Sequence, residues 1–183
     1  VRSRRQRQMC IRDRSRMDQV YSIHYFRVTD LWKKLCEAHQ QLLELTFDEY
    51  SLLLGSQIEE LEVKIEDKNE LIAFIAKLDN ERKEAISLLN KDLRKNNLKP
   101  IQNVADLIVT MKDYESKQDQ HHLRRFNALL IDIIEKIQSQ NKKNQLFINK
   151  ALMSLREIRE DAIGKKNYST YNAKGASAPG RSA

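Results

Sequence analysis

Residues 58–93 read IEELEVKIEDKNELIAFIAKLDNERKEAISLLNKDL. Apolar side chains recur there with the seven-residue spacing of a coiled coil, which predicts a long helix buried along one stripe. One seam position holds Ile58, Ile65, Ile72, Ile86 and Leu93, and the other holds Leu61, Ile75 and Leu89. Because Lys68, Asp79 and Arg82 fall in the same seam, the partner helix has to pair or solvate them.

A second helix is predicted upstream, over residues 18–54. Its leucines recur every three or four residues and so share one face: Leu31, Leu35, Leu42, Leu45 and Leu52 or Leu53. Gly55 then interrupts the pattern, and Ser56 with Glu59 has the spacing of a capping box, which opens a new helical segment. We expect a kink here more than a full turn.

Four aromatic residues, Tyr21, Tyr25, Phe26 and Trp32, lie in the first part of this helix. We expect them to pack against the C-terminal half of the returning helix, and partner binding is the alternative.

The chain is predicted to reverse after residue 93. Residues 91–100 read KDLRKNNLKP, and their asparagines and proline favour a turn. Asn103 can then cap a short helix, and residues 116–163 contain neither glycine nor proline, which favours a long returning helix. We expect the returning helix to bury Ile72 to Leu93 against its early part. The predicted fold is all-α: an elongated antiparallel helical hairpin or coiled coil with a short intervening helix and a C-terminal amphipathic helix.

The net charge of +7 is concentrated in the first sixteen residues, which hold seven arginines and one aspartate. This leader changes composition abruptly at Met17, and its segment RRQRQMCIRDRS resembles translated sequencing-adaptor DNA. We expect a disordered basic leader over residues 1–16, for which a nucleic-acid or targeting arm is the alternative. Residues 17–183 carry 26 basic and 25 acidic side chains, so the predicted helical domain over 17–163 is not expected to bind nucleic acid.

Enzyme and metal motifs are absent from the sequence. Only Cys36 remains outside the leader, the adjacent His121 and His122 point in different directions on a helix, and no phosphate-binding loop or nucleophile elbow occurs. We expect no enzyme activity, no cofactor and no metal. No apolar run approaches about 18 residues, so we expect no membrane insertion and a cytoplasmic protein.

The end of the returning helix differs from its beginning. Residues 138–145, QSQNKKNQ, contain no apolar side chain, and the apolar stripe that follows is broader than a two-helix seam needs. It comprises Leu146, Phe147, Ile148, Ala151, Leu152, Leu155, Ile158 and Ala162. We expect part of this surface to be free, although such a stripe can instead pack against the chain's own first helix. Residues 164–183 are rich in Gly, Ser, Ala and Lys and are expected to be a disordered tail.

The order of these features resembles the FlgN family. Two asparagines, an apolar helix, and a tyrosine and glycine in the tail follow one another here as Asn141, Asn144, Leu146, Leu152, Leu155, Tyr171 and Gly175. Residues 49–86, with Gly55, Lys68 and Arg82, are similar to the long N-terminal helix of the family. The resemblance covers about residues 40–175.

This resemblance implies a bacterial cytoplasmic chaperone that binds the C-terminal helices of hook-filament junction proteins and delivers them to the flagellar type III secretion apparatus. The export gate or the export ATPase is then a further partner. An amphipathic helix with a free apolar face can hold an amphipathic client helix. The predicted client-binding residues are Asn141, Asn144, Leu146, Ile148, Leu152, Leu155, Ile158, Tyr168 and Tyr171. The alternative function is a structural coiled-coil scaffold that dimerises through the same seams.

Overall fold

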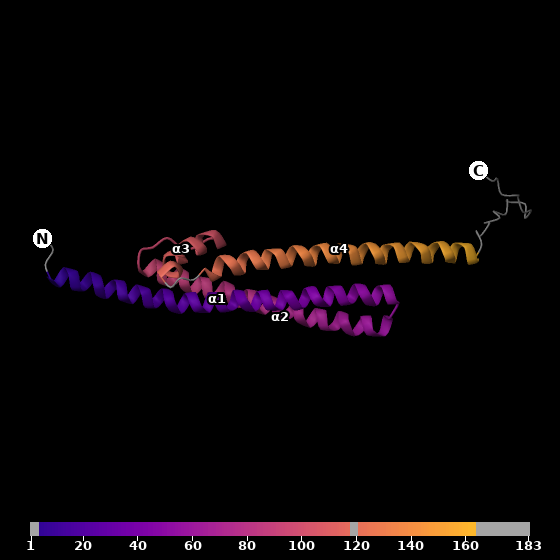
Figure 1. Ribbon diagram of the computed structural model, residues 1–183, viewed down its shortest axis with the longest axis horizontal. Coiled ribbons are helices and arrows are strands. Elements are labelled where there is room, and N and C mark those ends of the chain that lie inside the picture. Colours follow the sequence, from indigo (N-terminus) through magenta and orange to yellow (C-terminus); the bar gives the residue numbers. More distant parts are fainter. Residues whose placement is uncertain (1–3, 118–120, 164–183) are drawn as a thin grey trace, which may run out of the picture. The chain divides into compact units, whose positions relative to one another are not determined.

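The structure is a computed structural model that describes residues 4–117 and 121–163, with backbone only for residues 4–20, 113 and 117. These residues form four helices and no strand, so the predicted all-α class is confirmed (Figure 1). The helices are α1 (Arg4–Gly55), α2 (Ile58–Lys95), α3 (Val104–Lys117) and α4 (His122–Ile163). The chain divides into two compact units, residues 1–141 and 142–183, and α4 runs through both.

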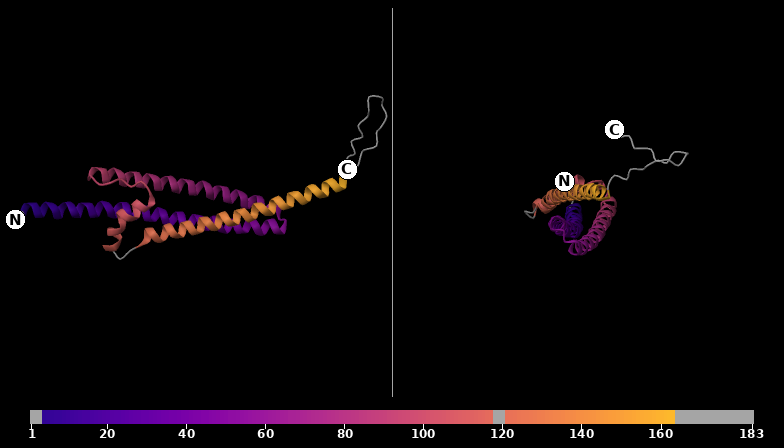
Figure 2. Two further views of the ribbon diagram at one scale, coloured as in Figure 1. Left: turned by 90° about the horizontal axis from the view of Figure 1, so that it is seen from above. Right: turned by 90° about the vertical axis from the view of Figure 1, so that its right-hand side faces the viewer.

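Helices α1 and α2 form an antiparallel hairpin that turns at residues 55–58 (Figures 1 and 2). The expected kink at Gly55 is therefore wrong, because the chain reverses there completely. Ser56 adopts a left-handed conformation with φ 54°, its amide bonds to the carbonyl of Leu53, and the amide of Gln57 bonds to that of Leu52. These two bonds are a Schellman motif, which ends α1. The expected capping box is also wrong, since Gln57 precedes α2 and makes no side-chain cap bond.

Substitution of Ser56 by glycine is expected to stabilise the fold. A side chain in the left-handed region costs about 1 kcal/mol, and glycine adopts that conformation without this cost. The free energy of unfolding, measured by urea titration, should rise by up to about 1 kcal/mol. The gain is smaller than the full cost of the left-handed conformation because glycine also gives the unfolded chain more freedom. Ser56→Ala is the matched control and should bring no gain, because alanine keeps the Cβ atom.

The second reversal, after α2, follows the prediction closely. Asn97 has φ 57° and closes another Schellman motif, in which the amide of Leu98 bonds to the carbonyl of Leu93. Asn90 holds the connection in place, since its side chain exchanges hydrogen bonds with the backbone of Ile101 at 2.7 and 2.9 Å. The side chain of Asn103 accepts a bond from the amide of Asp106 and caps α3, as predicted.

The main core lies where α1, α2, α3 and the beginning of α4 meet. Its fully enclosed side chains come from all four helices: Tyr25, Val28 and Trp32 of α1, Ala85 and Leu89 of α2, Leu107 and Met111 of α3, and Leu123 of α4. A smaller cluster joins Leu42 and Leu43 of α1 to Ile133 and Ile137 of α4. Because later residues of α1 meet later residues of α4, these two helices run parallel, and α4 is antiparallel to α2.

A buried carboxylate fixes the start of α4. Glu115 of α3 accepts hydrogen bonds from the Tyr25 hydroxyl at 2.9 Å and from the backbone amide of Leu123 at 3.0 Å. A negative charge satisfies a free amide in the first turn of a helix and interacts favourably with its dipole. Burial, with the hydrogen bond to Glu115, raises the pKa of Tyr25. Tyr25 therefore stays a neutral hydrogen-bond donor.

One of the two predicted seam positions of α2 is wrong in the N-terminal part of the helix, although its last two members, Ile86 and Leu93, are half-buried and enclosed as predicted. Leu89 is enclosed and Ile75 half-buried as expected, but Ile58, Ile65 and Ile72 are exposed. In the middle of the helix the packed position lies one residue earlier in the heptad, where Leu71 is half-buried and Leu78 and Ala85 are enclosed. Both registers satisfy the seven-residue spacing, and the neighbouring helices α1 and α4 select the second. Arg82 does lie in the seam, where it pairs with Asp79 at 2.6 Å and covers the ring of Trp32 at 4.8 Å.

The aromatic residues of α1 pack differently from the prediction. Tyr25 contacts Tyr114 of α3, and Trp32 lies beneath Arg82 of α2, whereas the prediction placed both against the C-terminal half of the returning helix. Phe26 is exposed. The segment around residue 30 thus forms the centre of the core, because α1 is the helix that α2, α3 and α4 share.

The leader also departs from expectation, since α1 begins at Arg4 and includes residues 4–16 of the segment expected to be disordered. The segment has no glycine or proline between residues 4 and 16, and arginine and glutamine have good helix propensity, so nothing in it stops the helix from extending. The expected tail at 164–183 lies outside the described residues.

Candidate functional site

Helix α4 changes character along its length. Up to Asn141 the apolar residues along one side of the helix are enclosed, since Leu123, Leu130, Ile133 and Ile137 are at most 9% exposed, whereas Leu129 and Ile131 on its other sides are 46% and 50% exposed. Beyond that point Phe147 and Ile148 are half-buried, and every residue from 151 to 163 is exposed. The helix is continuous across the change. Sequence composition predicts this break, because QSQNKKNQ supplies no apolar side chain between the two halves.

A polar cluster lies at the end of the packed half. The ammonium group of Lys68 on α2 pairs with Glu49 of α1 at 2.5 Å and donates a hydrogen bond to the side-chain oxygen of Asn141 at 3.1 Å. The side chains of Lys68 and Glu49 are only 16% and 15% exposed. The cluster thus links α1, α2 and α4, and it pairs Lys68 as the seam requires.

The two asparagines lie near the boundary between the packed and the exposed half of α4. Asn141 makes the bond to Lys68 and lies in the first unit, and Asn144 is buried. Whether either residue touches a client stays a prediction.

Removing the ammonium group of this cluster should destabilise the protein. Lys68→Met leaves the Glu49 carboxylate mostly buried without a counter-charge, which should lower the free energy of unfolding by about 1–3 kcal/mol. The double variant Lys68→Met with Glu49→Gln removes both charges and should recover at least half of the loss. Urea titrations of the two variants measure the difference. Equal destabilisation by single and double variants would mean that the ion pair contributes nothing.

Residues 142–163 form the helical part of the second unit. Of the predicted client-binding residues, Leu146, Leu152, Leu155 and Ile158 are 49–63% exposed and Ile148 is half-buried. At about 100° per residue, the side chains of Ile148, Leu152, Leu155 and Ile158 fall within about one third of the helix circumference. We call these four residues the client face.

Leu146 does not belong to that face. It is nine residues from Leu155, which places the two side chains about half a turn apart on the helix. Its exposed neighbour on the same side is Met153. Tyr168 and Tyr171, which we predicted to extend the face, lie outside the described residues.

Comparison with known families decides which class of protein carries this helix. The family model described as FlgN protein matches residues 17–179, nearly the whole chain. The chain belongs to the FlgN family. FlgN proteins are flagellar export chaperones, so this FlgN protein is an export chaperone in that general sense. No curated protein and no solved structure gave a significant match.

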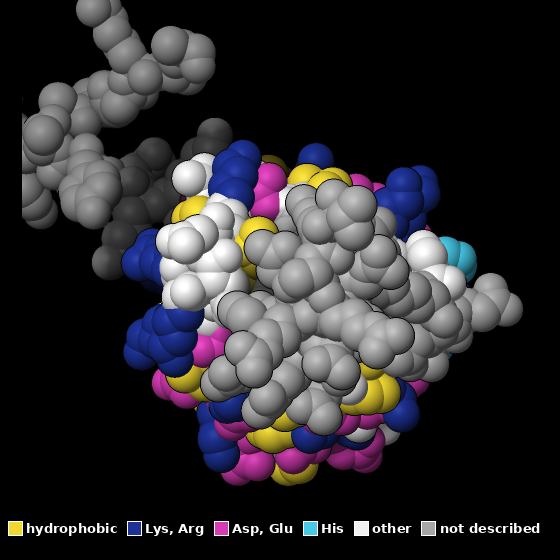
Figure 3. Space-filling view, turned by 90° about the vertical axis from the view of Figure 1, so that its left-hand side faces the viewer, with side chains coloured by type: hydrophobic (Ala, Val, Ile, Leu, Met, Phe, Trp, Pro, Cys, Tyr) yellow, Lys and Arg dark blue, Asp and Glu magenta, His cyan; other side chains and the backbone are white. Residues whose placement is uncertain are grey.

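Other kinds of site receive no support from the described part of this FlgN protein. No cluster of three or more His, Cys, Asp or Glu residues there could hold a metal ion. Cys36 is buried, donates to the carbonyl of Phe126 at 3.3 Å, and has a thiol pKa raised by burial, which disfavours the reactive thiolate. Among the helices described, none is long and apolar enough to cross a membrane. Lysines and arginines lie beside aspartates and glutamates around the edge of the face seen in Figure 3.

Proposed function

We propose that this FlgN protein binds the C-terminal helices of hook-filament junction proteins and delivers them to the flagellar type III secretion apparatus in the bacterial cytoplasm. The observation that carries the proposal is the contrast within α4. One side of its first half, formed by Leu123, Leu130, Ile133 and Ile137, is enclosed in clusters with the other helices, whereas Leu152, Leu155 and Ile158 in its second half leave 49–63% of their surface exposed and every residue from 151 to 163 is exposed. Exposed apolar residues at helical spacing are typical of a helix that packs against a partner.

The client face suits a helix better than an extended peptide. Ile148, Leu152 and Leu155 follow at spacings of four and three residues, so they form a ridge that can enter the groove of another helix. Full burial of one leucine or isoleucine contributes about 1.5–3 kcal/mol, of which about half remains available on residues that are half exposed. The four residues together supply enough free energy of burial for a transient complex. A chaperone requires such a complex because it has to release its client.

No catalytic step is needed for this function. A chaperone of this kind acts by covering apolar surface that would otherwise aggregate, and by releasing it at the export machinery. Contact with the export gate or the export ATPase is part of the proposal, and client binding can be tested without it.

Light scattering during size-exclusion chromatography tests the proposal against the scaffold alternative. The full chain is run alone and with a peptide of the C-terminal helix of a junction protein. A monomer that forms a one-to-one complex supports the export chaperone. A stable dimer without affinity for the peptide contradicts it and supports the scaffold.

A further inference from the structure

The turn end of the α1–α2 hairpin carries a charge that the rest of the chain does not share. Residues 44–70, which we call the hairpin tip, contain nine acidic and two basic side chains, a net charge of −7. Both basic groups are engaged with α1, Lys64 with Asp48 at 3.3 Å and Lys68 with Glu49. The other seven carboxylates form no ion pair with any described residue: Glu44, Glu59, Glu60, Glu62, Glu66, Asp67 and Glu70.

Apolar side chains lie exposed among these carboxylates. Five of them within twenty residues retain 41–57% of their surface: Phe47, Leu54, Ile58, Val63 and Ile65. Single exposed aliphatic residues are ordinary, but five at one end of a hairpin are a candidate interaction surface. Val63, Asp67 and Glu70 follow at spacings of four and three residues, so an apolar group and two carboxylates share one face of α2.

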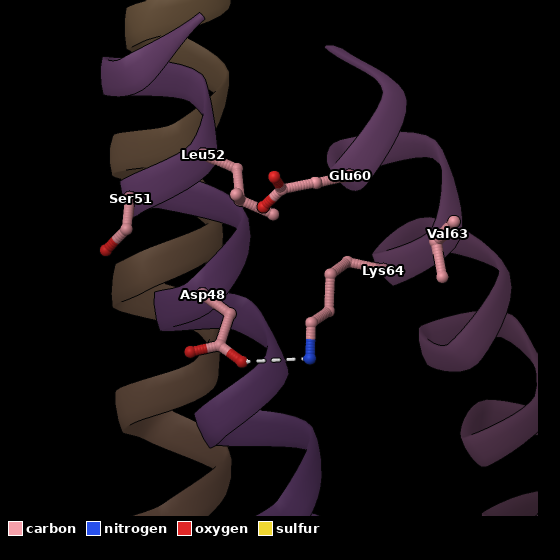
Figure 4. Close-up of a pocket in the computed structure, with 6 residues that line it drawn as sticks. All are labelled: Asp48, Ser51, Leu52, Glu60, Val63 and Lys64. Carbon is pink, nitrogen blue, oxygen red and sulfur yellow. Dashed lines mark ion pairs between the residues drawn. The ribbon is translucent and has the colours of Figure 1, made fainter. Parts of the chain in front are cut away.

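A groove separates the two helices at the tip. Its walls are Asp48, Ser51 and Leu52 of α1 and Glu60, Val63 and Lys64 of α2, and its volume is about 330 Å³ (Figure 4). The ion pair from Lys64 to Asp48 spans it, and Leu52 and Glu60 lie toward each other from opposite helices. The groove can take one or two aliphatic side chains and has carboxylates at its edges.

We propose that the hairpin tip is a second interaction surface of this protein, which binds a basic amphipathic helix of a partner protein. Aliphatic side chains of that helix enter the groove beside Leu52 and Val63, and its lysines and arginines meet the unpaired carboxylates. Residues 58–70 extend over about 20 Å at 1.5 Å per residue, which matches three to four turns of the partner helix. Complementary charge gives such a surface fast association and selects against acidic partners.

Two other occupants fit the tip less well. A second copy of the chain would bring one surface of charge −7 against another, and like charges across an interface are unfavourable. The chain's own residues 164–183 are basic, with three lysines and one arginine and no acid, but they contain no Leu, Ile, Val, Met or Phe to fill the groove. A partner helix supplies both the charge and the apolar side chains.

A labelled peptide of leucine and lysine, about 14 residues long to give four helical turns, tests the assignment by fluorescence anisotropy with the full chain. The double variant Asp67→Lys with Glu70→Lys should weaken binding by about tenfold or more, because it reverses two carboxylates on the binding face. Glu84→Lys with Glu135→Lys is the matched control, since both residues are exposed, lie outside the tip and change the net charge equally. It should weaken binding less than about threefold.

A separate substitution tests the apolar part of the surface. Val63→Ser removes an exposed aliphatic side chain from the groove wall. It should lower the affinity for the peptide about threefold or more without loss of helicity. Aspartates at Leu152 and Leu155 should leave the peptide affinity unchanged, because the client face is a separate surface. Failure of client binding and failure of this proposal are thereby distinguished.

Three results would overturn the proposal. Equal weakening by the tip variant and the control pair would show general attraction between a basic peptide and an acidic protein. A dimer at micromolar concentration that Asp67→Lys with Glu70→Lys abolishes would make a second copy the occupant. Stronger peptide binding after Lys165→Gln with Lys166→Gln would make the chain's own tail the occupant.

Discussion

Replacing Leu152 and Leu155 together by aspartate is expected to weaken binding of a junction-protein helix more than about 100-fold, while the far-UV circular dichroism of the free protein is retained. The two leucines are 49% and 62% exposed, so the variant removes little packing from the free chain. In the complex it removes two buried aliphatic groups and places two charges in an apolar interface, at a cost of about 3 kcal/mol or more. Isothermal titration calorimetry measures the change in affinity.

The matched control is Met153→Asp with Ser154→Asp. Both residues are exposed, lie in the same turn of α4 and receive the same charge, but they point about 100° or more away from Leu152 and Leu155. Affinity should remain within about threefold of the original protein. Loss of binding in the control would show that any added charge on α4 is harmful. Unfolding of the leucine variant would show that those side chains are core.

Leu78→Ala is expected to lower the free energy of unfolding by about 3 kcal/mol, and Ile72→Ala by less than about 1 kcal/mol. Leu78 is 4% exposed and packs in the main core, so its truncation leaves a cavity. Ile72 is 46% exposed on the same helix. Chemical denaturation of both variants measures the difference.

The two substitutions compare the observed register of α2 with the register that its isoleucines suggest. The reverse order of the two losses would mean that Ile72 faces the core and that the observed register is wrong. Leu88→Ala provides a further control, because Leu88 is an exposed neighbour of the enclosed Leu89 and should behave like Ile72.

The positions of the helices along the chain could be predicted from sequence, whereas the helices that each of them packs against could not. Sparse glycine and proline, heptad spacing and the Asn103 cap locate the helices to within a few residues at most ends. The seam of α2 was placed at Ile58, Ile65 and Ile72 because isoleucine is the stronger coiled-coil signal. Which heptad position is buried depends on helices α1 and α4, and local spacing contains no information about them.

The turn at residues 55–58 was missed for a related reason. Gly55 suggested the break, but the residue that reverses the chain is Ser56, which adopts the left-handed conformation that glycine usually provides. If the chain only kinks at Gly55, α2 extends away from the aromatic segment around Trp32 and cannot pack against it. With the hairpin closed, that segment meets Arg82 instead.

The exposure of the second half of α4 follows from its sequence, whereas its role as a client-binding site stays a prediction. The absence of apolar residues from 138 to 145 predicts the change along α4, and the family resemblance indicates a client-binding role for the residues that follow. Leu146 was included because periodicity was judged over a broad stripe, although its phase on the helix differs. The bond between Lys68 and Asn141 joins residues that are 73 positions apart, which no local pattern indicates. The hairpin tip did have a sequence signal, the acidic run from Glu59 to Glu70, which a charge count over the whole domain averages away.

Hydrogen–deuterium exchange with and without a junction-protein helix tests most directly whether the second half of α4 is a free client-binding surface. In the free protein, amides of residues 146–163 should exchange much faster than those of residues 123–137, because few buried contacts hold that half of the helix. Client binding should then slow exchange over residues 146–163 alone. Slow exchange of that segment in the free protein, unchanged by the client, would contradict the account.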